Sequence, residues 1–243
     1  YGILEDGLVF RLHQQPGHME PIPLSEAKVL PLVTPSKVVC VGLNYKAHAE
    51  ELGYPLPNMP SFFLKPPSSI IGNGEPIVLP SGMGRIEHEA ELAMVVGKVC
   101  RNLTPEEAEE SLFGFTCAND VTAREVQKVD PLIGHCKSYD TFCPIGPWIE
   151  TELEDINDLS IRCLVNGEVR QSANTGDMIF RPLDLLCFLS RVMTLMPGDV
   201  ILTGTPPGIS PIQADDVVQV SIEGIGTLSN PVEGPGPEEK ILQ

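Results

Sequence analysis

The stretch that decides the fold runs from Ile86 to Gly97 and reads Ile-Glu-His-Glu-Ala-Glu-Leu-Ala-Met-Val-Val-Gly. Its first half alternates acidic residues with others, and its second half is apolar and ends in two β-branched residues. This pattern favours a β-strand over a helix. Because side chains on a strand alternate between its two faces, Glu87, Glu89 and Glu91 are predicted to share one face, and His88 to lie on the other.

An acidic strand face of this kind has two interpretations, because like charges side by side need either open water or a cation. The first is an ordinary solvated face. The second is a site for a hard metal ion, with oxygen ligands from one strand. A third acid would decide between them, and Asp120 is the candidate, since it ends the apolar stretch Phe113–Asn119. An aspartate in that position is costly unless it is paired, hydrogen-bonded or bound to metal.

The composition limits the classes of partner. The 243 residues, 42% of them hydrophobic, are enough for one large domain or for a catalytic domain with a small appendage. The 22 glycines and 24 prolines indicate many turns and a β-rich architecture. The net charge of −17 argues against nucleic acid and anionic membrane surfaces as partners. An anionic substrate would need a local positive site.

Seven cysteines, an odd number without any Cys-x-x-Cys, imply neither a disulfide framework nor a zinc ribbon. Most lie in apolar stretches, which is typical of buried thiols in a reducing compartment. No apolar segment approaches the roughly 20 residues needed to span a bilayer, and the chain shows no signal peptide. We therefore expect a cytoplasmic protein.

Local signals predict several elements. They are Asp6-Gly7 and Asn166-Gly167 for β-hairpins, Thr104 with Glu107 for a helix that begins with a capping box, and residues 183–193 for an amphipathic helix.

Two further positions have open interpretations. His48 and Glu51 lie three residues apart in a short helical pattern that Gly53 ends, so they share a face. They are either a surface pair or a histidine made more basic by a carboxylate, as a general base requires. Lys65 ends an apolar strand before Pro66, where it is either an edge-strand charge or an anchor for a carboxylate.

Several short motifs occur along the chain between roughly residues 37 and 232. They are Gly42-Leu43-Asn44-Tyr45 with His48 and Glu51, Phe63-Leu64-Lys65-Pro66, Glu89-Ala90-Glu91-Leu92, Asn119-Asp120-Val121-Thr122-Ala123-Arg124 with Gln127, Lys137 with Asp140-Thr141-Phe142, Val165-Asn166-Gly167 with Gln171, and Pro197-Gly198-Asp199 through Gly204-Thr205-Pro206 to Gly208. Taken together and in this order, they resemble the fumarylacetoacetate hydrolase superfamily.

The resemblance implies a mixed, β-rich (α+β) fold, a β-roll or sandwich. It places a small N-terminal β appendage at residues 1–36 and a metal-dependent catalytic domain at 37–243, usually assembled as a homodimer. It further implies a divalent ion, normally Mg²⁺ with Mn²⁺ or Ca²⁺ as alternatives, because carboxylate ligands without histidine or cysteine suit these ions better than Zn²⁺.

By motif position, the resemblance assigns roles to ten residues. The implied metal ligands are Glu89, Glu91 and Asp120, the catalytic residues His48, Glu51 and Lys137, and the substrate-binding residues Lys65, Arg124, Gln127 and Thr205. Glu87 lies outside the family's ligand pattern, and His88 is interpreted as a packing residue.

The implied activity is on 2-oxo or 2-hydroxy-enol dicarboxylic acids through a metal-bound enolate. Residues 48–53 and 204–210 most resemble the isomerase/decarboxylase of homoprotocatechuate degradation, which acts on 2-hydroxyhepta-2,4-diene-1,7-dioate. Acylpyruvate hydrolase and oxaloacetate decarboxylase remain alternatives, because such enzymes share almost all of these residues. A non-catalytic 2-oxo-acid-binding protein is an alternative of another class, although a binder has no need of a base.

Overall fold

The structure, a computed structural model, describes residues 1–12, 20–130 and 132–234. It divides into two compact units, residues 1–30 and 31–243. The first contains a three-stranded antiparallel sheet of β1 (Gly2–Glu5), β2 (Leu8–Arg11) and β3 (Ile22–Pro23), followed by a 3-10 turn at Leu24–Glu26. Asp6 and Gly7 join β1 to β2 with φ of 48° and 77°, so this hairpin prediction is confirmed.

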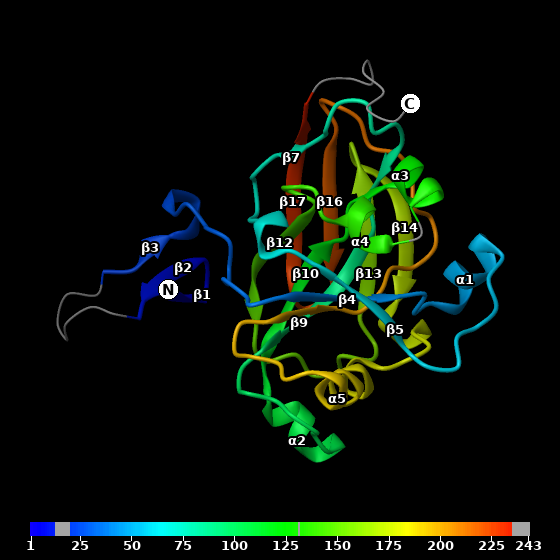
Figure 1. Cartoon of the computed structure of the whole chain (residues 1–243). Helices are drawn as coiled ribbons and strands as arrows, with labels where there is room; N and C mark the ends of the chain where they lie inside the picture. Colours follow the sequence, from blue (N-terminus) through cyan, green and yellow to red (C-terminus); the bar gives the residue numbers. More distant parts are fainter. Residues whose placement is uncertain (13–19, 131, 235–243) are drawn as a thin grey trace. The chain divides into compact units, whose positions relative to one another are not determined.

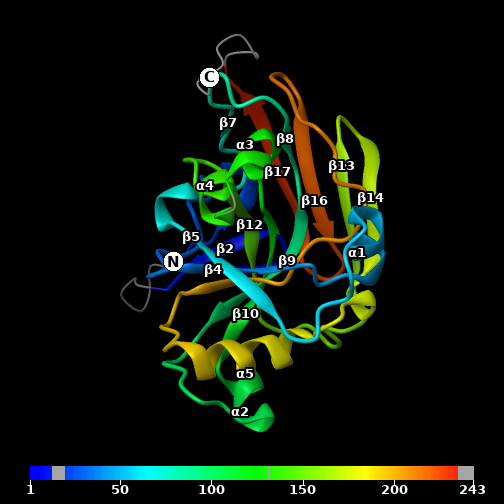
Figure 2. The same cartoon turned by 45° about the vertical axis from the view of Figure 1, so that its right-hand side comes forward.

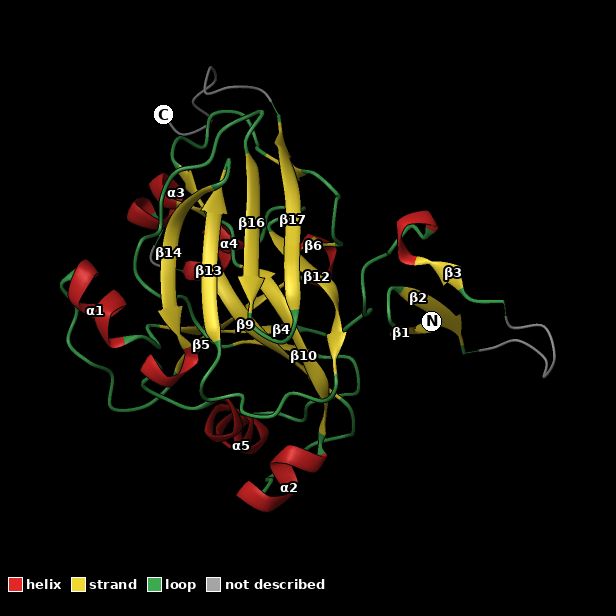
Figure 3. Cartoon of the chain, turned by 180° about the vertical axis from the view of Figure 1, so that it is seen from behind, coloured by secondary structure: helices red, strands yellow, loops and turns green. Residues whose placement is uncertain are grey.

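The second unit is built on two sheets that lie one over the other (Figure 3). In spatial order the seven-stranded sheet consists of β5 (Ser61–Lys65), β4 (Val38–Gly42), β15 (Val200–Leu202), β9 (Ala90–Val96), β10 (Leu112–Asn119), β12 (Cys143–Glu150) and β6 (Ile70–Ile71). The five-stranded sheet consists of β14 (Glu168–Asn174), β13 (Ser160–Val165), β16 (Val217–Ile222), β17 (Gly226–Glu233) and β7 (Ile77–Val78). A separate pair joins β8 (Ile86–Glu87) to β11 (Thr122–Ala123). The β-rich fold predicted from the sequence is confirmed.

The helices are short and lie around the sheets (Figure 1). They are α1 (Lys46–Leu52), α2 (Pro105–Glu110), α3 (Arg124–Val129), α4 (Ile133–Lys137) and α5 (Pro182–Val192), with further 3-10 turns at Pro67–Ser69 and Thr175–Asp177. The capping box of Thr104 and Glu107 at α2 and the Asn166-Gly167 hairpin between β13 and β14 are confirmed. Among the described residues, no helix combines the length and the apolar character needed to cross a membrane.

The two faces of the seven-stranded sheet have different surroundings. One face packs against the five-stranded sheet and α5 in the main core, which includes Leu92 and Met94 of β9. The other carries a smaller apolar cluster, which includes Ala93 of β9 and Ala118 of β10. Because side chains alternate along a strand, Glu91 and Asp120 belong to this second face. All seven cysteines are buried free thiols, so the burial predicted for most of them is confirmed.

The antiparallel register of β9 and β10 brings together acids that are about thirty residues apart in the chain. Ala118 lies opposite Glu91, and Asn119 lies opposite Ala90. One residue further on, the N–H of Asp120 donates to the carbonyl oxygen of Glu89 over 2.9 Å. The start of β9 and the end of β10 therefore meet at one point of the sheet.

Candidate metal centre and active site

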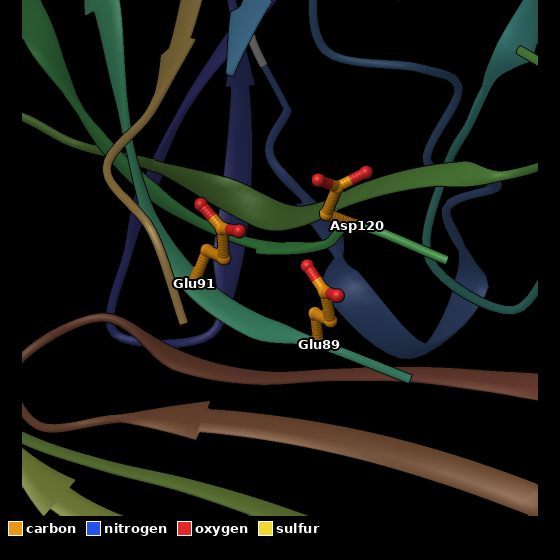
Figure 4. A group of neighbouring side chains, drawn as sticks. All are labelled: Glu89, Glu91 and Asp120. Carbon is orange, nitrogen blue, oxygen red and sulfur yellow. The ribbon is translucent and has the colours of Figure 1, made fainter. Parts of the chain in front are cut away.

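Three carboxylates converge where β9 begins and β10 ends. Glu89, Glu91 and Asp120 each offer an oxygen, and the three oxygens lie within 4.8 Å of one another. Figure 4 shows the two glutamates leaving one ribbon and Asp120 facing them from the next. All three residues are buried, at 6%, 1% and 1% exposure. The solvated-face interpretation is therefore wrong for these acids.

Cations of the chain compensate the buried acids. Lys137, at the end of α4, places its Nζ 2.7 Å from Glu89 Oε2 and 2.7 Å from Asp120 Oδ2. Lys65, at the end of β5, places its Nζ 2.5 Å from Asp120 Oδ1 and also donates to the carbonyl of Val121. Although β5 is an edge strand, Lys65 is 1% exposed, so it anchors a carboxylate and is not a solvated edge charge.

Burial and neighbouring charges set the pKa values of the cluster. Burial alone would raise the pKa of Glu89, but Lys137 and Arg124 outweigh it and hold that pKa well below its usual range. The pKa of Glu91 is raised by burial and by the charges of Asp120 and Glu89. Burial opposes the charged form of Lys137, yet Asp120 and Glu89 outweigh it, so the pKa of Lys137 rises. The lysine therefore stays an ammonium ion.

The predicted continuous strand from Ile86 to Gly97 is wrong in one respect, because it breaks at His88 and Glu89. There the N–H of Glu89 donates to the side-chain Oδ1 of Asn119 over 2.9 Å, and a side chain thus replaces a ladder partner. As a result Glu87 belongs to β8, where it pairs with β11. Glu87 also lies outside the cluster of three acids.

Arg124 links Glu87 to the cluster. Its Nε donates to Glu87 Oε2 over 2.6 Å, and its Nη2 donates to Glu89 Oε1. Its Nη1 donates to Gln127 Oε1 over 2.9 Å, so two of the four residues predicted to bind substrate lie side by side on α3. The sequence interpretation left Glu87 without a role, although the alternation of acids was a signal for it.

His48 and Glu51 form a hydrogen-bonded pair on α1, which lies beyond the β14 edge of the five-stranded sheet (Figures 1 and 2). His48 Nδ1 lies 2.9 Å from Glu51 Oε2, and His48 is 5% exposed. The backbone N–H of Gly208 donates to Glu51 Oε1 over 3.0 Å, which ties α1 to the loop after β15. The surface-pair interpretation does not fit a histidine this buried.

The loop after β15 supplies backbone donors to the cluster. The N–H of Gly204 donates to Glu91 Oε2 over 2.5 Å. The hydroxyl of Thr205 is occupied, since it donates to the carbonyl of Ala90 over 2.9 Å and accepts from Gln171 Nε2 over 2.8 Å. Any contact of Thr205 with a substrate would therefore come from its backbone N–H, which has no partner among the described residues.

Two residues near the cluster have features that the sequence interpretation missed. His88 is fully buried and hydrogen-bonded at both ring nitrogens, so it does more than pack. Tyr45, at the start of α1, carries the one buried side-chain oxygen that lacks a hydrogen-bond partner in the described part of the chain. The pKa of Tyr45 is raised by burial and by the charges of Glu91 and Asp177. Nothing in the local sequence signalled this orphaned hydroxyl.

The donor set fits a hard divalent cation. Three carboxylates offer only oxygen ligands, which Mg²⁺, Mn²⁺ and Ca²⁺ prefer, and no histidine or cysteine belongs to the cluster. Three carboxylates around one dication leave a net negative charge, and the ammonium group of Lys137 is placed to compensate it. Glu89, Glu91 and Asp120 remain predicted ligands on this basis.

Comparison with known proteins places the chain among enzymes. A mitochondrial oxaloacetate tautomerase from Homo sapiens is 42% identical over 225 residues, 87% of this chain and 71% of that protein. The crystal structure of a 2-hydroxyhepta-2,4-diene-1,7-dioate isomerase from Mycobacterium marinum is 42% identical, with a TM-score of 0.86 over 94% of this chain and 88% of that one. A maleylpyruvate hydrolase from Sphingobium sp. SYK-6, solved with manganese(II) and pyruvate, is 31% identical, with a TM-score of 0.82 over 96% and 95% of the two chains.

The family model for the C-terminal region of fumarylacetoacetate hydrolase matches residues 37–233, most of the chain. This match covers every strand of the two large sheets and all the residues of the acidic cluster. The chain therefore belongs to the fumarylacetoacetate hydrolase family.

Proposed function

We propose that this chain is a divalent-metal-dependent enzyme that acts on 2-oxo or 2-hydroxy-enol dicarboxylic acids, and that its native reaction is an isomerisation or decarboxylation. The observation that carries the proposal is the buried cluster of Glu89, Glu91 and Asp120 with Lys137 between two of them. The oxaloacetate tautomerase and the hydroxy-dienedioate isomerase among the similar proteins are named for such substrates.

In the proposed reaction, the metal ion and the residues of the chain have separate roles. A dication in the cluster would act as a Lewis acid toward an oxo or enol oxygen of the substrate. Lys137 keeps a permanent positive charge beside that position, where negative charge develops. Arg124 and Gln127, already bonded to each other, carry further guanidinium and amide N–H groups that can donate to a carboxylate of the substrate.

His48 is the proposed general base. With the ring proton on Nδ1 donated to Glu51, the lone pair of Nε2 can take a proton from the carbon next to the oxo group. Glu51 stabilises the imidazolium that results, and Gly208 holds Glu51 in place. The proton can then return to a different carbon, which completes an isomerisation.

The His48–Glu51 pair also supports a second candidate function, C–C bond hydrolysis of an acylpyruvate. A histidine paired with a carboxylate can activate water as readily as it moves a proton. Isomerisation and hydrolysis both need this base, whereas decarboxylation of oxaloacetate does not. His48→Ala is expected to abolish hydrolysis and to leave decarboxylation of oxaloacetate largely intact. Equal loss of both activities would show that the pair has another role.

The test is to screen the metal-supplemented protein for turnover of 2-hydroxyhepta-2,4-diene-1,7-dioate, oxaloacetate and acylpyruvates. Turnover is monitored by the absorbance of the enol. We expect turnover that is lost in EDTA and in Glu89→Gln or Asp120→Asn. Asp199→Asn is the matched control, because Asp199 is also a buried carboxylate but adjoins Val96, at the other end of β9. Full activity in EDTA would refute the proposal. Tight oxalate binding without turnover of any oxo acid would favour the non-catalytic alternative.

A further inference from the structure

The residue between the two glutamates of the cluster is held by side chains at both of its backbone polar groups. The N–H of Ala90 donates to Gln171 Oε1 over 3.0 Å, and its carbonyl accepts from the hydroxyl of Thr205 over 2.9 Å. Because Ala90 lies between Glu89 and Glu91, these two bonds help to set how the two carboxylates are placed relative to each other.

Gln171 is the centre of this arrangement. Its Nε2 donates to Thr205 Oγ1 over 2.8 Å and to the carbonyl of Pro206 over 2.7 Å. Its Oε1 accepts from Ala90 and lies 3.1 Å from His88 Nδ1. Because the N–H of Ala90 can only donate, the amide orientation is fixed, and His88 must carry its proton on Nδ1.

His88 connects Gln171 to Ser210. Its Nε2 lies 2.8 Å from Ser210 Oγ, which donates to it, and the ring is fully buried. Ser210 belongs to the same loop as Gly204, whose N–H binds Glu91. His88 therefore joins the loop after β15 to the strand break that carries the cluster, and it does so through one donor and one acceptor atom.

We propose that His88 is a positioning residue that acts through Gln171 to fix the spacing of the Glu89 and Glu91 carboxylates for a divalent cation. This inference rests on the proposed function, since it assumes that the cluster binds a metal. Mutation of a residue that orients the ligands of a metal without touching the metal commonly lowers the affinity for that metal by about 10- to 100-fold.

The proposal distinguishes the two hydrogen bonds of His88. The amide nitrogen of an asparagine can replace Nδ1, so His88→Asn keeps the donor to Gln171 and loses the contact with Ser210. The longer His88→Gln reaches toward Ser210 and loses the donor to Gln171. We expect His88→Asn to bind Mn²⁺ within about threefold of the unchanged protein, and His88→Gln to bind it about tenfold more weakly.

The experiment is a calorimetric titration of the full chain with Mn²⁺, together with the Tm of each variant without metal. Asn230→Ala is the control, since Asn230 is a buried side chain of β17 that bonds the carbonyls of Gly72 and Glu75, away from β9. It should lower Tm and leave Mn²⁺ affinity unchanged. In a Gln171→Leu background, the difference between the two His88 variants should disappear.

Each outcome has a definite meaning. Equal Mn²⁺ affinity of His88→Asn and His88→Gln, whatever their Tm, overturns the positioning role and leaves a structural one. A persistent difference between them in the Gln171→Leu background overturns the route through Gln171. If the unchanged chain binds no Mn²⁺, the proposed function itself fails, and the positioning role fails with it.

Discussion

Replacing Lys137 with methionine keeps most of the length of the side chain and removes its charge. The ammonium group is buried and bonds Glu89 and Asp120 at 2.7 Å each, so the variant leaves both carboxylates less compensated. Breaking a buried ion pair costs about 3–5 kcal/mol. Because Arg124 still bonds Glu89 and Lys65 still bonds Asp120, we expect the lower end, about 3 kcal/mol. For a chain of this size, that corresponds to a fall of roughly 10 °C in Tm.

The assay is denaturant unfolding in EDTA and again in excess Mg²⁺. A dication supplies the positive charge that the variant lacks, so Mg²⁺ should restore part of the lost free energy of unfolding and stabilise the variant more than the unchanged protein. Lys128→Met is the matched control, because Lys128 pairs with Glu125 on the exposed side of α3 and should cost less than about 1 kcal/mol. Unchanged stability of Lys137→Met in EDTA would refute the placement of the ammonium between the two acids.

Three further predictions concern other parts of the chain. Tyr45→Phe should raise the free energy of unfolding of the metal-free protein by about 1–3 kcal/mol, because it removes a buried hydroxyl without a hydrogen-bond partner. A loss of stability would show that the hydroxyl has a partner. Burial opposes ionisation of Asp199, but hydrogen bonds from Lys37, the N–H of Met196 and Ser36 outweigh it and lower its pKa. The ionised carboxylate of Asp199 should therefore contribute its full stabilisation above about pH 4, and this stabilisation should be lost as the pH falls through the lower pKa of the folded state. When Tm is measured against falling pH, Asp199→Asn should show a smaller decline than the unchanged protein. Light scattering should give about twice the monomer mass of 26.4 kDa if the chain forms the homodimer that the family resemblance implies; a monomer mass would contradict it.

Local sequence signals predicted the elements that depend on neighbouring residues. Asn166 and Gly167 adopt φ of 53° and 79°, the conformation that this residue pair favours in a two-residue hairpin. The capping box at Thr104 is likewise complete within one turn of helix. Such features are decided by a few adjacent residues, so they survive in almost any tertiary context.

The parts that the sequence pattern missed depend on contacts between distant segments. The strand from Ile86 breaks because the side chain of Asn119, thirty residues away, takes the N–H of Glu89. Arg124 joins Glu87 to Glu89, and His88 bonds Gln171, which is 83 residues away. Periodicity describes which face a residue occupies, and it carries no information about which distant side chain meets it there.

The choice of the three acids drew on both kinds of argument. Alternation along the strand marked Glu89 and Glu91, and the cost of an acid at the end of an apolar strand marked Asp120. The resemblance to a known family then set Glu87 apart from them, which the pattern alone could not do, since all three glutamates alternate in the same way.

The most direct test of the account is an anomalous diffraction map of crystals grown with Mn²⁺. A single manganese peak about 2.0–2.6 Å from oxygens of Glu89, Glu91 and Asp120 is the predicted result. A map with no peak among these three carboxylates, or with manganese bound elsewhere in the chain, would contradict the claim that they hold one divalent ion.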